Sequence, residues 1–336
     1  MLNIELLKKL TSIPSPSGFT HNQTLFLKEF IESLGLETFQ NHKGNVFTKI
    51  KGESNYTITL AAHIDTLGLM VRSIDPSGKI YFTNIGGPIL NTYDGEYCKI
   101  HTRSGKIYTG TVLSTSPSVH VYKDANTKER NINTMYIRID ELVKNKKDVE
   151  DLGIMVGDYV SIDAKFEYTQ SGYIKTRFLD DLASAFLLLS LLKELKEQNI
   201  TPKCNLQFAF TTYEEVGHGC SNLPQTDELL VVDMGCIGQD LGCTEEMVSI
   251  CAKDGSGPYD YFMTSKLISL AKEANLDFAV DVYPFYSSDG SAALRGGNDV
   301  KCALIGAGIH ASHGMERTHI KGLENTYKLI KLYINK

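Results

Sequence analysis

The sequence lacks any apolar stretch long enough to cross a lipid bilayer. Its longest hydrophobic run, AFLLLSLLKEL at residues 185–195, is shorter than the roughly 20 residues that a membrane-spanning helix needs, and it is charged near its end. The N-terminal segment MLNIELLKKLTSIPSPSG also lacks the apolar core of a secretory signal peptide. We therefore expect a cytoplasmic protein that has no membrane partner.

A basic stripe is also absent. The net charge is -6 and the isoelectric point is about 5.9, with lysines scattered along the chain. Because a nucleic-acid-binding surface needs clustered positive charge, we expect no nucleic acid partner. The 7 cysteines are odd in number, widely spaced and mostly within apolar runs, which indicates reduced thiols rather than a disulfide framework.

No fixed-period repeat or low-complexity tract occurs in the 336 residues, of which 42% are hydrophobic. A chain of this size can bury a large core and usually contains more than one structural unit. Segments of helix and strand periodicity alternate, which predicts an α/β sheet with helices on both faces. The clearest helices are expected at 20–35, 183–195, 261–274 and 323–334, and the clearest strands at 56–62, 174–179, 205–213, 228–233 and 300–308.

Residues 68–174 have a different character. Their apolar runs are short and alternating, with Gly, Pro and Asn between them and one expected helix at 141–152. This pattern predicts a compact β-barrel inserted into the α/β unit. The α/β unit is then discontinuous, at residues 1–67 and 175–336, and the insert must leave and return at nearby points.

Acidic residues and histidines recur at the ends of the predicted strands. They occur in five separated segments: His63 and Asp65 in AAHIDTLGLMV, Asp180 and Asp181 in TRFLDDLAS, Glu214 and Glu215 in TTYEEVGHG, Asp233 in LLVVDMG, and His313 in ASHGMERTH. Ligands of α/β sheets bind outside the carboxyl ends of the strands, so these side chains are expected to converge. Carboxylates and imidazoles from several segments can hold two neighbouring divalent cations, which indicates a two-metal hydrolytic site.

Local geometry suggests roles for some of these residues. Asp65, two residues past His63 on an extended segment, can accept the second imidazole N–H and thereby fix the tautomer of the ligand. Asp180 precedes a helix, whose N-terminal field favours a carboxylate while both oxygens stay available to two cations. Glu214 and Glu215 point in opposite directions on an extended chain, so one is expected to bind metal and the other to act on water.

Longer motifs extend the pattern over nearly the whole chain: SGFTHNQTLFLKEFIESLG, HKGNVFTKIKG, AAHIDTLGLMVRSIDPSGKIYFTNIGG, GIMVGDYV, FLDDLASA, YEEVG, VVDMG, YSSDGSA and HGMERTHIKGLENT. In these motifs the chain resembles the M42 family of metallo-aminopeptidases, which includes tetrahedral and glutamyl aminopeptidases. The resemblance implies a zinc-peptidase-like mixed sheet flanked by helices, with the inserted small β-barrel as a dimerisation domain. It also implies hydrolysis of N-terminal residues from short peptides that have a free N-terminus.

Position by position, the resemblance implies a role for each site residue. The implied ligands are divided between two metal ions: His63 and Asp233 for one, Glu215 and His313 for the other, and Asp180 as the bridge. Glu214 would be the general base and acid that acts on a metal-bridging water, and Asp65 would orient His63. Each subunit would hold two divalent ions, Zn or Co, with Mn also accepted by such carboxylate and imidazole sites.

Two neighbouring residues compete with these assignments. His310 lies three residues before His313 and is the alternative ligand, but Glu316 and Arg317 after His313 preserve the register of the family. Asp181 is interpreted as a helix-start residue rather than a ligand.

Three further residues lie close to the motifs. His218 and Cys220 are near Glu215 in sequence and are interpreted as loop and core residues, because the ligand set is complete without them. Asp289 resembles an acidic position that shapes the substrate pocket of the family, although serines precede it where glycine and threonine are common. Its role stays open.

Other function classes compete with the aminopeptidase. A metal-dependent N-acyl amino acid deacylase, or another amidohydrolase, could use the same metals and base, and would differ only in the pocket that reads the amine. Hydrolysis of a glucan is disfavoured because a glycosidase would leave His63 and His313 without a role. A catalytically silent assembly protein is disfavoured because every ligand type is present together with Glu214.

The predicted insert is rich in aromatic and branched residues that look exposed: Tyr81, Phe82, Tyr97, Tyr108, Val119, Val121 and Tyr122. Such an apolar surplus usually marks an interface. In the resembled family this domain pairs subunits into dimers, which often assemble into a hollow tetrahedral dodecamer, so we expect a homo-oligomer. His120 would lie at the pairing surface, reach a neighbour's site or be a plain surface histidine, and these three alternatives stay open.

Overall fold

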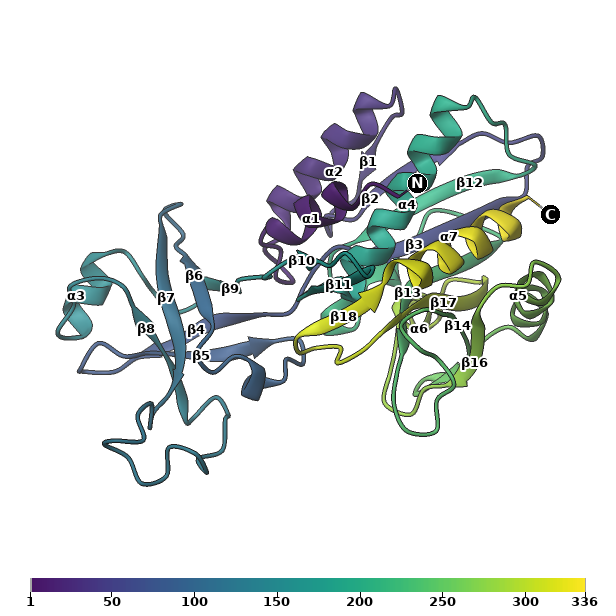
Figure 1. Cartoon of the computed structure of the whole chain (residues 1–336). Coiled ribbons are helices and arrows are strands. Elements are labelled where there is room, and N and C mark those ends of the chain that lie inside the picture. The colour runs from purple at the N-terminus through teal and green to yellow at the C-terminus, as the bar shows by residue number, and fades with distance from the viewer. Residues whose placement is uncertain (1, 336) are drawn as a thin grey trace.

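The computed structural model describes residues 2–335. A mixed sheet with helices packed against it forms the right-hand part of the molecule in Figure 1. Its strands lie in the order β1 (Phe39–Gln40), β2 (Val46–Ile50), β12 (Asn205–Thr211), β3 (Thr57–His63), β13 (Glu228–Cys236), β17 (Lys301–Ile309), β14 (Val248–Asp254) and β15 (Gly257–Pro258), and β16 (Phe278–Val282) also pairs with β14. The predicted α/β class with a mixed sheet is confirmed.

The middle of this sheet is parallel. β3 pairs in parallel with both β12 and β13, and β13 pairs in parallel with β17. β2 and β14 join the two sides of this group in antiparallel direction. Because parallel strands end at the same edge, the residues that follow β3, β12, β13 and β17 come together on one side of the sheet.

Alternate side chains of the strands enter two separate hydrophobic cores, because successive residues of a strand point to opposite faces. In β3, Leu60 and Ala62 belong to one core and Ala61 to the other. The first core is covered by α1 (Ile4–Ser12), α2 (His21–Ser33), α4 (Leu179–Glu197), α5 (Tyr261–Glu273) and α7 (Ile320–Ile334), and the second by α6 (Asp289–Arg295). The sheet is therefore a middle layer that positions the site at its edge.

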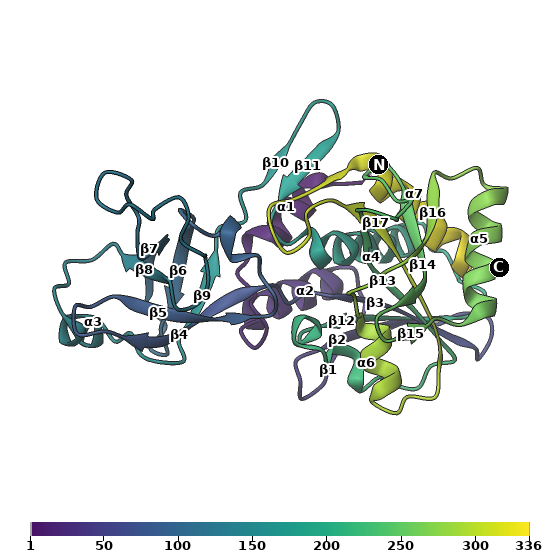
Figure 2. The same ribbon diagram turned by 90° about the horizontal axis from the view of Figure 1, so that it is seen from below.

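A closed barrel lies beside the sheet, on the left of Figures 1 and 2. Its strands follow the order β4 (Gly68–Ile74), β5 (Ile80–Ile85), β8 (Met135–Ile139), β7 (Ile107–Ser114), β6 (Tyr97–His101) and β9 (Tyr159–Ile162), and α3 (Lys146–Asp151) lies between β8 and β9 in the chain. The barrel interior is buried and includes Ile80, Ile100 and Val160, which belong to the same hydrophobic cluster as the first core of the sheet. The predicted small β-barrel, inserted between the strand of His63 and the helix of Asp180, is confirmed.

The chain leaves the sheet and returns to it at nearby points. Thr66 and Phe178 line the same small cavity of about 350 Å³. Next to this junction the buried guanidinium of Arg177 donates to the main-chain oxygen of Thr92 at 2.7 Å and to that of Gly314 at 3.0 Å. Arg177 thus ties the barrel to the loop that follows β17.

A third, small sheet joins β10 (Glu167–Tyr168), β11 (Tyr173–Thr176) and β18 (Glu316–His319). The strand predicted at 174–179 belongs to this sheet and not to the central one, because β11 pairs with β18 in antiparallel register from Tyr173 opposite His319. The prediction that every candidate ligand follows a central strand is therefore wrong for Asp180, which reaches the site from the start of α4. Pairing between such distant segments is not visible in a local pattern.

Two helices differ from the sequence prediction. The helix expected at 141–152 is limited to Lys146–Asp151, because the side chain of Asn145 accepts a hydrogen bond from the N–H of Asp148 and starts the helix there. The helix α6 was not predicted. Its signal was the serine pair before Asp289, since Ser288 forms the capping box at its N-terminus.

The exposed apolar surface of the barrel is smaller than predicted. Phe82 is fully buried in the barrel interior, because its position on β5 points inward. Tyr97, Val119, Val121 and Tyr122 are exposed. Over the described residues 2–335, none of the helices combines the length and apolar character that crossing a membrane requires.

Candidate active site

Three candidate ligands meet at the carboxyl edge of the central sheet. His63 ends β3, and its Nε2 atom lies 3.1 Å from Oδ1 of Asp180 at the start of α4. Asp233, in β13, offers a carboxylate oxygen at the same place, so that ligand atoms of the three residues lie within 4.8 Å of one another. All three side chains are buried.

The second oxygen of Asp180 faces a different pair of residues. Oδ2 lies 3.6 Å from Nε2 of His313, which lies 3.6 Å from Oε2 of Glu215. Ligand atoms of Asp180, Glu215 and His313 also lie within 4.8 Å of one another. Asp180 is therefore shared, with one oxygen directed toward each group of three.

Both histidines use one ring nitrogen to bind a main-chain carbonyl. Nδ1 of His63 donates to the carbonyl oxygen of Asp65 at 2.9 Å, and Nδ1 of His313 donates to that of Gly87 at 2.9 Å. Each Nε2 atom is left to face the acids. A histidine held in this way presents the lone pair of Nε2 to a metal ion. Because Gly87 belongs to the inserted segment, the insert helps to orient His313.

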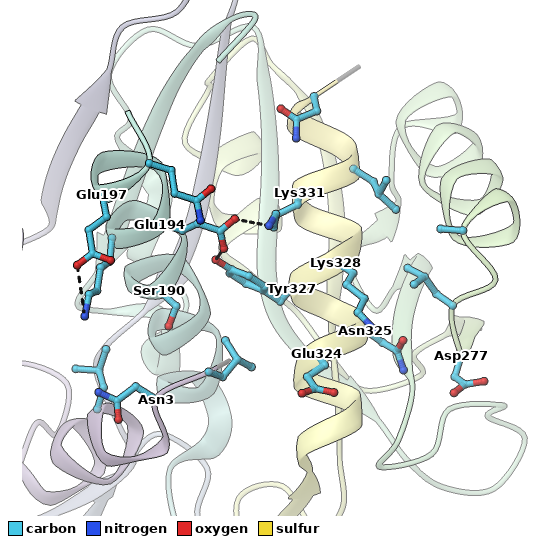
Figure 3. A pocket seen from close by; sticks show the side chains of 18 of the residues that line it. Asn3, Ser190, Glu194, Glu197, Asp277, Glu324, Asn325, Tyr327, Lys328 and Lys331 are labelled. Carbon is cyan, nitrogen blue, oxygen red and sulfur yellow. Dashed lines mark hydrogen bonds and ion pairs between the residues drawn. The ribbon is translucent and has the colours of Figure 1, made fainter. Parts of the chain in front are cut away.

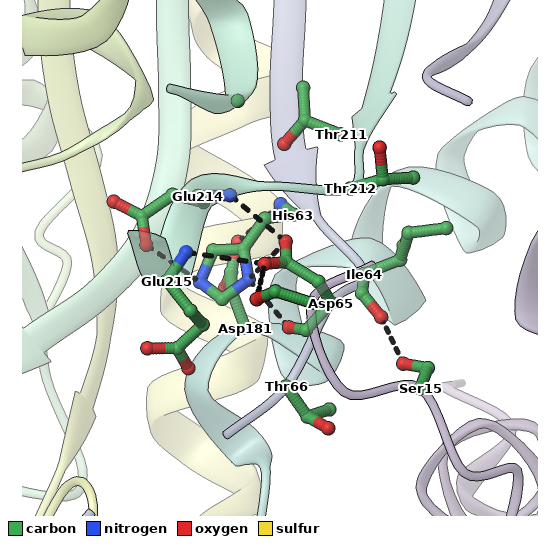
Figure 4. A network of polar contacts seen from close by, with 12 residues as sticks. Ser15, His63, Ile64, Asp65, Thr66, Asp181, Thr211, Thr212, Glu214 and Glu215 are labelled. Atoms are coloured by element: carbon green, nitrogen blue, oxygen red, sulfur yellow. Dashed lines mark hydrogen bonds and ion pairs between the residues drawn. The ribbon is translucent and has the colours of Figure 1, made fainter. Parts of the chain in front are cut away.

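Glu214 and Glu215 lie on a 3-10 turn directly after β12 (Figure 4), so the prediction of an extended backbone is wrong here. The turn is held by the carboxylate of Asp65, which accepts the N–H of Glu214 at 3.1 Å and that of Glu215 at 3.2 Å. The two side chains nevertheless diverge. Oε2 of Glu214 lies 3.7 Å from Nε2 of His63, whereas Glu215 faces His313.

The carboxylate of Asp65 holds the glutamate turn rather than the imidazole. It also accepts the hydroxyl of Ser17 at 2.5 Å, whereas its Oδ1 atom is 3.6 Å from Nδ1 of His63. The imidazole donates to the main-chain carbonyl of Asp65 instead. Asp65 therefore connects the first ligand segment to the turn that carries both glutamates.

Glu316 fixes the main chain of two site residues. Its buried carboxylate accepts the N–H of Asp180 at 3.1 Å and the N–H of His313 at 3.0 Å. His313 has a φ of 64°, a left-handed conformation that is unfavourable for a side-chain-bearing residue and must be held by its surroundings. The sequence indicated Glu316 only as a register marker. Its position three residues after His313 was the available signal for this contact.

Burial opposes the charged form of Asp180, but the hydrogen bonds and charges of His313 and His63 outweigh it and lower the pKa of that carboxyl below its usual value. The pKa values of other site acids are raised. Burial, together with the charge of Asp180, raises the pKa of Asp233 to about 7. Burial also raises the pKa of Glu214 and that of Glu215 well above the usual glutamate value. Burial opposes the charged form of His313, but the carboxylates of Asp180 and Glu215 outweigh it and raise the pKa of His313 to about 10. The acidic groups of the site therefore carry more negative charge than the nearby histidines can neutralise.

The donor set fits divalent cations. Each group of three offers carboxylate oxygens and one imidazole nitrogen, which Zn, Co and Mn accept. Cations held between the acids would relieve the repulsion that raises their pKa values. The shared carboxylate of Asp180 fits two adjacent ions.

Two residues next to the ligands lie outside both groups. His310 is exposed, and its main chain pairs with that of Arg317. Asp181 is buried at the start of α4, where its Oδ2 atom accepts the N–H of His63 at 3.2 Å.

The remaining residues singled out from the sequence also lie outside the groups. Asp289 is buried and accepts hydrogen bonds from the N–H of Cys220, at 2.7 Å, and from the hydroxyl of Thr211. It therefore anchors the segment on either side of the glutamate turn. His218 is exposed and stacks on Tyr213, with ring centroids 4.9 Å apart.

A cavity of about 1340 Å³ lies far from these residues, between α1, α4, α7 and the segment after α5 (Figure 3). In it, Glu194 forms an ion pair with Lys331 and accepts the hydroxyl of Tyr327 at 2.7 Å. At 1.5 Å per residue, Glu194 is about 20 Å along α4 from Asp180. Its described lining residues contribute to neither candidate metal group, so this cavity is not the candidate active site.

Comparison with known proteins identifies the family. The model of the M42 glutamyl aminopeptidase family matches residues 44–329. YhfE of Bacillus subtilis, which is named as a candidate aminopeptidase, is 46% identical over 334 residues, covering 98% of this chain and 96% of that protein. The chain therefore belongs to the M42 glutamyl aminopeptidase family, and it is an aminopeptidase, a hydrolase of peptide bonds.

Solved structures share the fold over nearly their full length. The TET aminopeptidase of a marine sediment Thaumarchaeota archaeon has a TM-score of 0.89 at 23% identity, covering 99% of this chain and 96% of that chain. The TET1 peptidase of Pyrococcus horikoshii, which can assemble into a tetrahedron or a large octahedral shell, has a TM-score of 0.86 at 24% identity, covering 99% of each chain. At this level of identity the likeness shows the fold.

Proposed function

We propose that this aminopeptidase uses two metal ions to remove N-terminal residues from short peptides. The observation that carries the proposal is the position of Asp180, whose two oxygens face two different groups of ligands. A single ion would need only one of these groups. A carboxylate shared between two groups is the arrangement that a pair of ions a few Å apart requires.

In this proposal the ligands are divided as the geometry groups them. His63 and Asp233 hold one ion, Glu215 and His313 hold the other, and Asp180 bridges them. We propose Zn or Co as the resident ions, with Mn as a further ion that such a donor set accepts. Two such ions, when bound, would lower the pKa of a water molecule between them to roughly 7 and polarise the carbonyl group of the substrate.

Glu214 is the proposed general base and acid. Its carboxylate lies 3.7 Å from Nε2 of His63, beside both ligand groups, but it belongs to neither of them. Asp65 fixes its main chain, which limits the region that the carboxylate can occupy. Glu214 would take a proton from this water and return it to the amine that leaves.

We expect hydrolysis of substrates with a free N-terminus only. The site has an excess of carboxylates, and a protonated amine next to the scissile bond would pair with them. Acetylation removes this charge and should lower kcat/KM by roughly 10²-fold or more. The measurement compares a panel of aminoacyl-anilides with their N-acetylated counterparts, with Zn, Co or Mn added in turn.

The same panel separates the alternative function. A metal-dependent N-acyl amino acid deacylase would release acetate or another acyl group from the blocked substrates and ignore the free ones. Equal cleavage of free and blocked peptides would also contradict the proposed exopeptidase. Such a result would leave the fold and the family membership intact.

We further propose that residues 1–67 and 175–336 form the catalytic unit and that residues 68–174 form a dimerisation domain in a cytoplasmic homo-oligomer. The barrel carries exposed apolar side chains at Tyr97, Val119 and Val121. Exposed apolar patches of this kind mark protein interfaces. The assemblies of the Pyrococcus horikoshii TET1 peptidase support a closed oligomer, and the 7 free cysteines support a reducing compartment.

Light scattering should therefore give a mass of at least twice the 37.3 kDa of the chain, and a tetrahedral dodecamer would be six such dimers. Val121→Glu places a charge on the exposed barrel surface and should shift the mass toward the monomer. The matched control is Tyr261→Glu, which is equally exposed but lies on α5, away from the barrel. A fully active monomer, or dissociation by the control alone, would exclude pairing through the barrel. His120, exposed on the same segment, becomes relevant to the site only if the oligomer forms.

A further inference from the structure

The loop that carries His313 packs against one segment of the insert, residues 86–92 between β5 and β6. Nδ1 of His313 donates to the main-chain oxygen of Gly87 at 2.9 Å. In return, the N–H of Ile89 donates to the main-chain oxygen of His313 at 3.1 Å. The insert therefore orients this ligand, whereas the histidine and the aspartate of the first ligand group lie in strands of the central sheet.

A buried arginine joins the same two segments. Arg177 is 1% exposed and lies just before α4. Its Nη1 atom donates to the main-chain oxygen of Gly314, the residue after His313, at 3.0 Å. Its Nη2 atom donates to the main-chain oxygen of Thr92 at 2.7 Å. The two nitrogens of one planar fork thus bind a carbonyl group on each side of the contact.

The other partners of Arg177 belong to the insert. The carboxylate of Glu96 lies 3.6 Å from Nη2, and the ring centroid of Tyr93 lies 4.8 Å from the guanidinium carbon. The main-chain N–H of Arg177 donates to the main-chain oxygen of Ala164 at 2.8 Å. A buried charge needs partners of this kind. Removal of the guanidinium would leave both carbonyl groups without the donor that joins them.

The loop of His313 needs these restraints. The φ of His313 is 64° and that of Ala311 is 58°, in a left-handed region that residues with side chains seldom adopt. On one side the carboxylate of Glu316 holds the loop by accepting the N–H of His313. On the other side it is held by residues 86–92 and by Arg177. Loss of the arginine should therefore let the imidazole turn away from its ligand group.

We propose that Arg177 is a positioning residue for the second metal ion, because it fixes the loop of His313 against the insert. This inference rests on the proposed function and extends it. The ion held by the Glu215 group depends on the docked insert, whereas the ion held by the His63 group does not. Arg177 contacts neither ion in this proposal, and it acts through the main chain next to His313.

The test is a calorimetric titration of metal-free protein with Mn, which binds such sites less tightly than Co or Zn, so that a loss of affinity can be measured. Arg177→Met removes the fork and keeps an unbranched side chain. One of the two binding events should weaken by roughly 10- to 100-fold, as when the partner of a metal ligand is removed. The other event should stay within a few-fold of the parent.

A double variant assigns the weakened event. Glu215→Gln is expected to leave only the ion of the His63 group. Adding Arg177→Met to this background should keep the affinity for the remaining ion within a few-fold, because the two changes act on the same ligand group. A further large loss in the double variant would overturn the selective role of Arg177.

Charge alone is the competing explanation. Arg177→Lys keeps the positive charge next to Glu96 but presents one ammonium group in place of the planar fork. It should weaken the same binding event, although less than Arg177→Met does. Because the buried charge is kept, this variant also provides the measurement if Arg177→Met does not fold. Parental affinity for both ions in either folded variant would overturn the proposal.

Arg72→Met is the matched control. Arg72 lies on β4 in the barrel and donates to the main-chain oxygen of Ile132 at 2.8 Å and to the side chain of Asn133 at 3.1 Å. The control should lower the melting temperature and leave both binding events near those of the parent. Equal weakening of both events in Arg177→Met, or a similar change in Arg72→Met, would indicate a general loss of structure and overturn the positioning role.

Failure of the proposed function would give a different result. It is overturned, and this inference with it, if the parent protein binds fewer than two ions per chain. It is also overturned if the metal-loaded parent does not hydrolyse free aminoacyl-anilides. If the parent binds two ions and the Arg177 variants bind both with the same affinity, this inference alone is overturned.

Discussion

Glu214→Gln should reduce turnover by roughly 10²-fold or more while the metal content stays near that of the parent. The substitution keeps the size of the side chain and removes the proton acceptor. The hydrogen bond that holds this residue to Asp65 comes from its main-chain N–H, so the turn should keep its geometry. The measurement combines steady-state kinetics with elemental analysis of the purified variant.

Glu215→Gln is the matched partner of this experiment. It makes the same chemical change one residue later, on the same turn, but its carboxylate faces His313 instead of His63. This variant should lose metal from the second site. If Glu214→Gln loses metal and Glu215→Gln retains it, the base and the ligand have been assigned in the wrong order.

Removal of metal should abolish hydrolysis, and addition of Zn, Co or Mn should restore it. Without cations the site also holds an excess of buried acids. Burial and the charge of Asp180 raise the pKa of Asp233 to about 7, and burial raises that of Glu316 to about 8. Cations relieve this repulsion only in the folded protein, so their removal should also lower the melting temperature. Activity after chelation and the melting curve are measured on the same sample.

Elemental analysis provides the control for this experiment. The chelated protein must be shown to hold no residual metal. Recovery of the melting temperature must then be measured after metal addition. Undiminished turnover by metal-free protein would contradict the two-metal proposal. Loss of turnover without any change in melting temperature would show that the ions serve chemistry alone.

The sheet and its helices could be read from local patterns. The apolar alternation at 205–213 and the apolar run at 228–233 predict strands, and β12 and β13 occur there. The helix predicted at 183–195 occurs within α4, and its apolar first part, residues 183–189, is buried on all sides, whereas Lys193 is exposed. The pairing of β11 with β18 could not be read, because it depends on a partner more than a hundred residues away in the chain.

The glutamate turn shows where local reasoning about the site ends. An extended backbone predicted that Glu214 and Glu215 diverge, and they do, but on a 3-10 turn. The cause is the carboxylate of Asp65, which accepts two successive N–H groups from a segment far along the chain. Likewise, the part of Glu316 in holding Asp180 and His313 follows from hydrogen bonds that no spacing rule would specify.

The sequence by itself determined that the chain contains acids and histidines suited to bind metal ions, and that most of them follow parallel strands. Strand periodicity and acid motifs are local properties, so His63, Glu215 and Asp233 could be identified as candidate ligands without coordinates. Only the tertiary structure decided which oxygen of Asp180 faces which histidine, and which main-chain N–H groups the carboxylate of Asp65 accepts. Those contacts depend on the angles and distances at which distant segments pack, and local sequence patterns do not specify that packing.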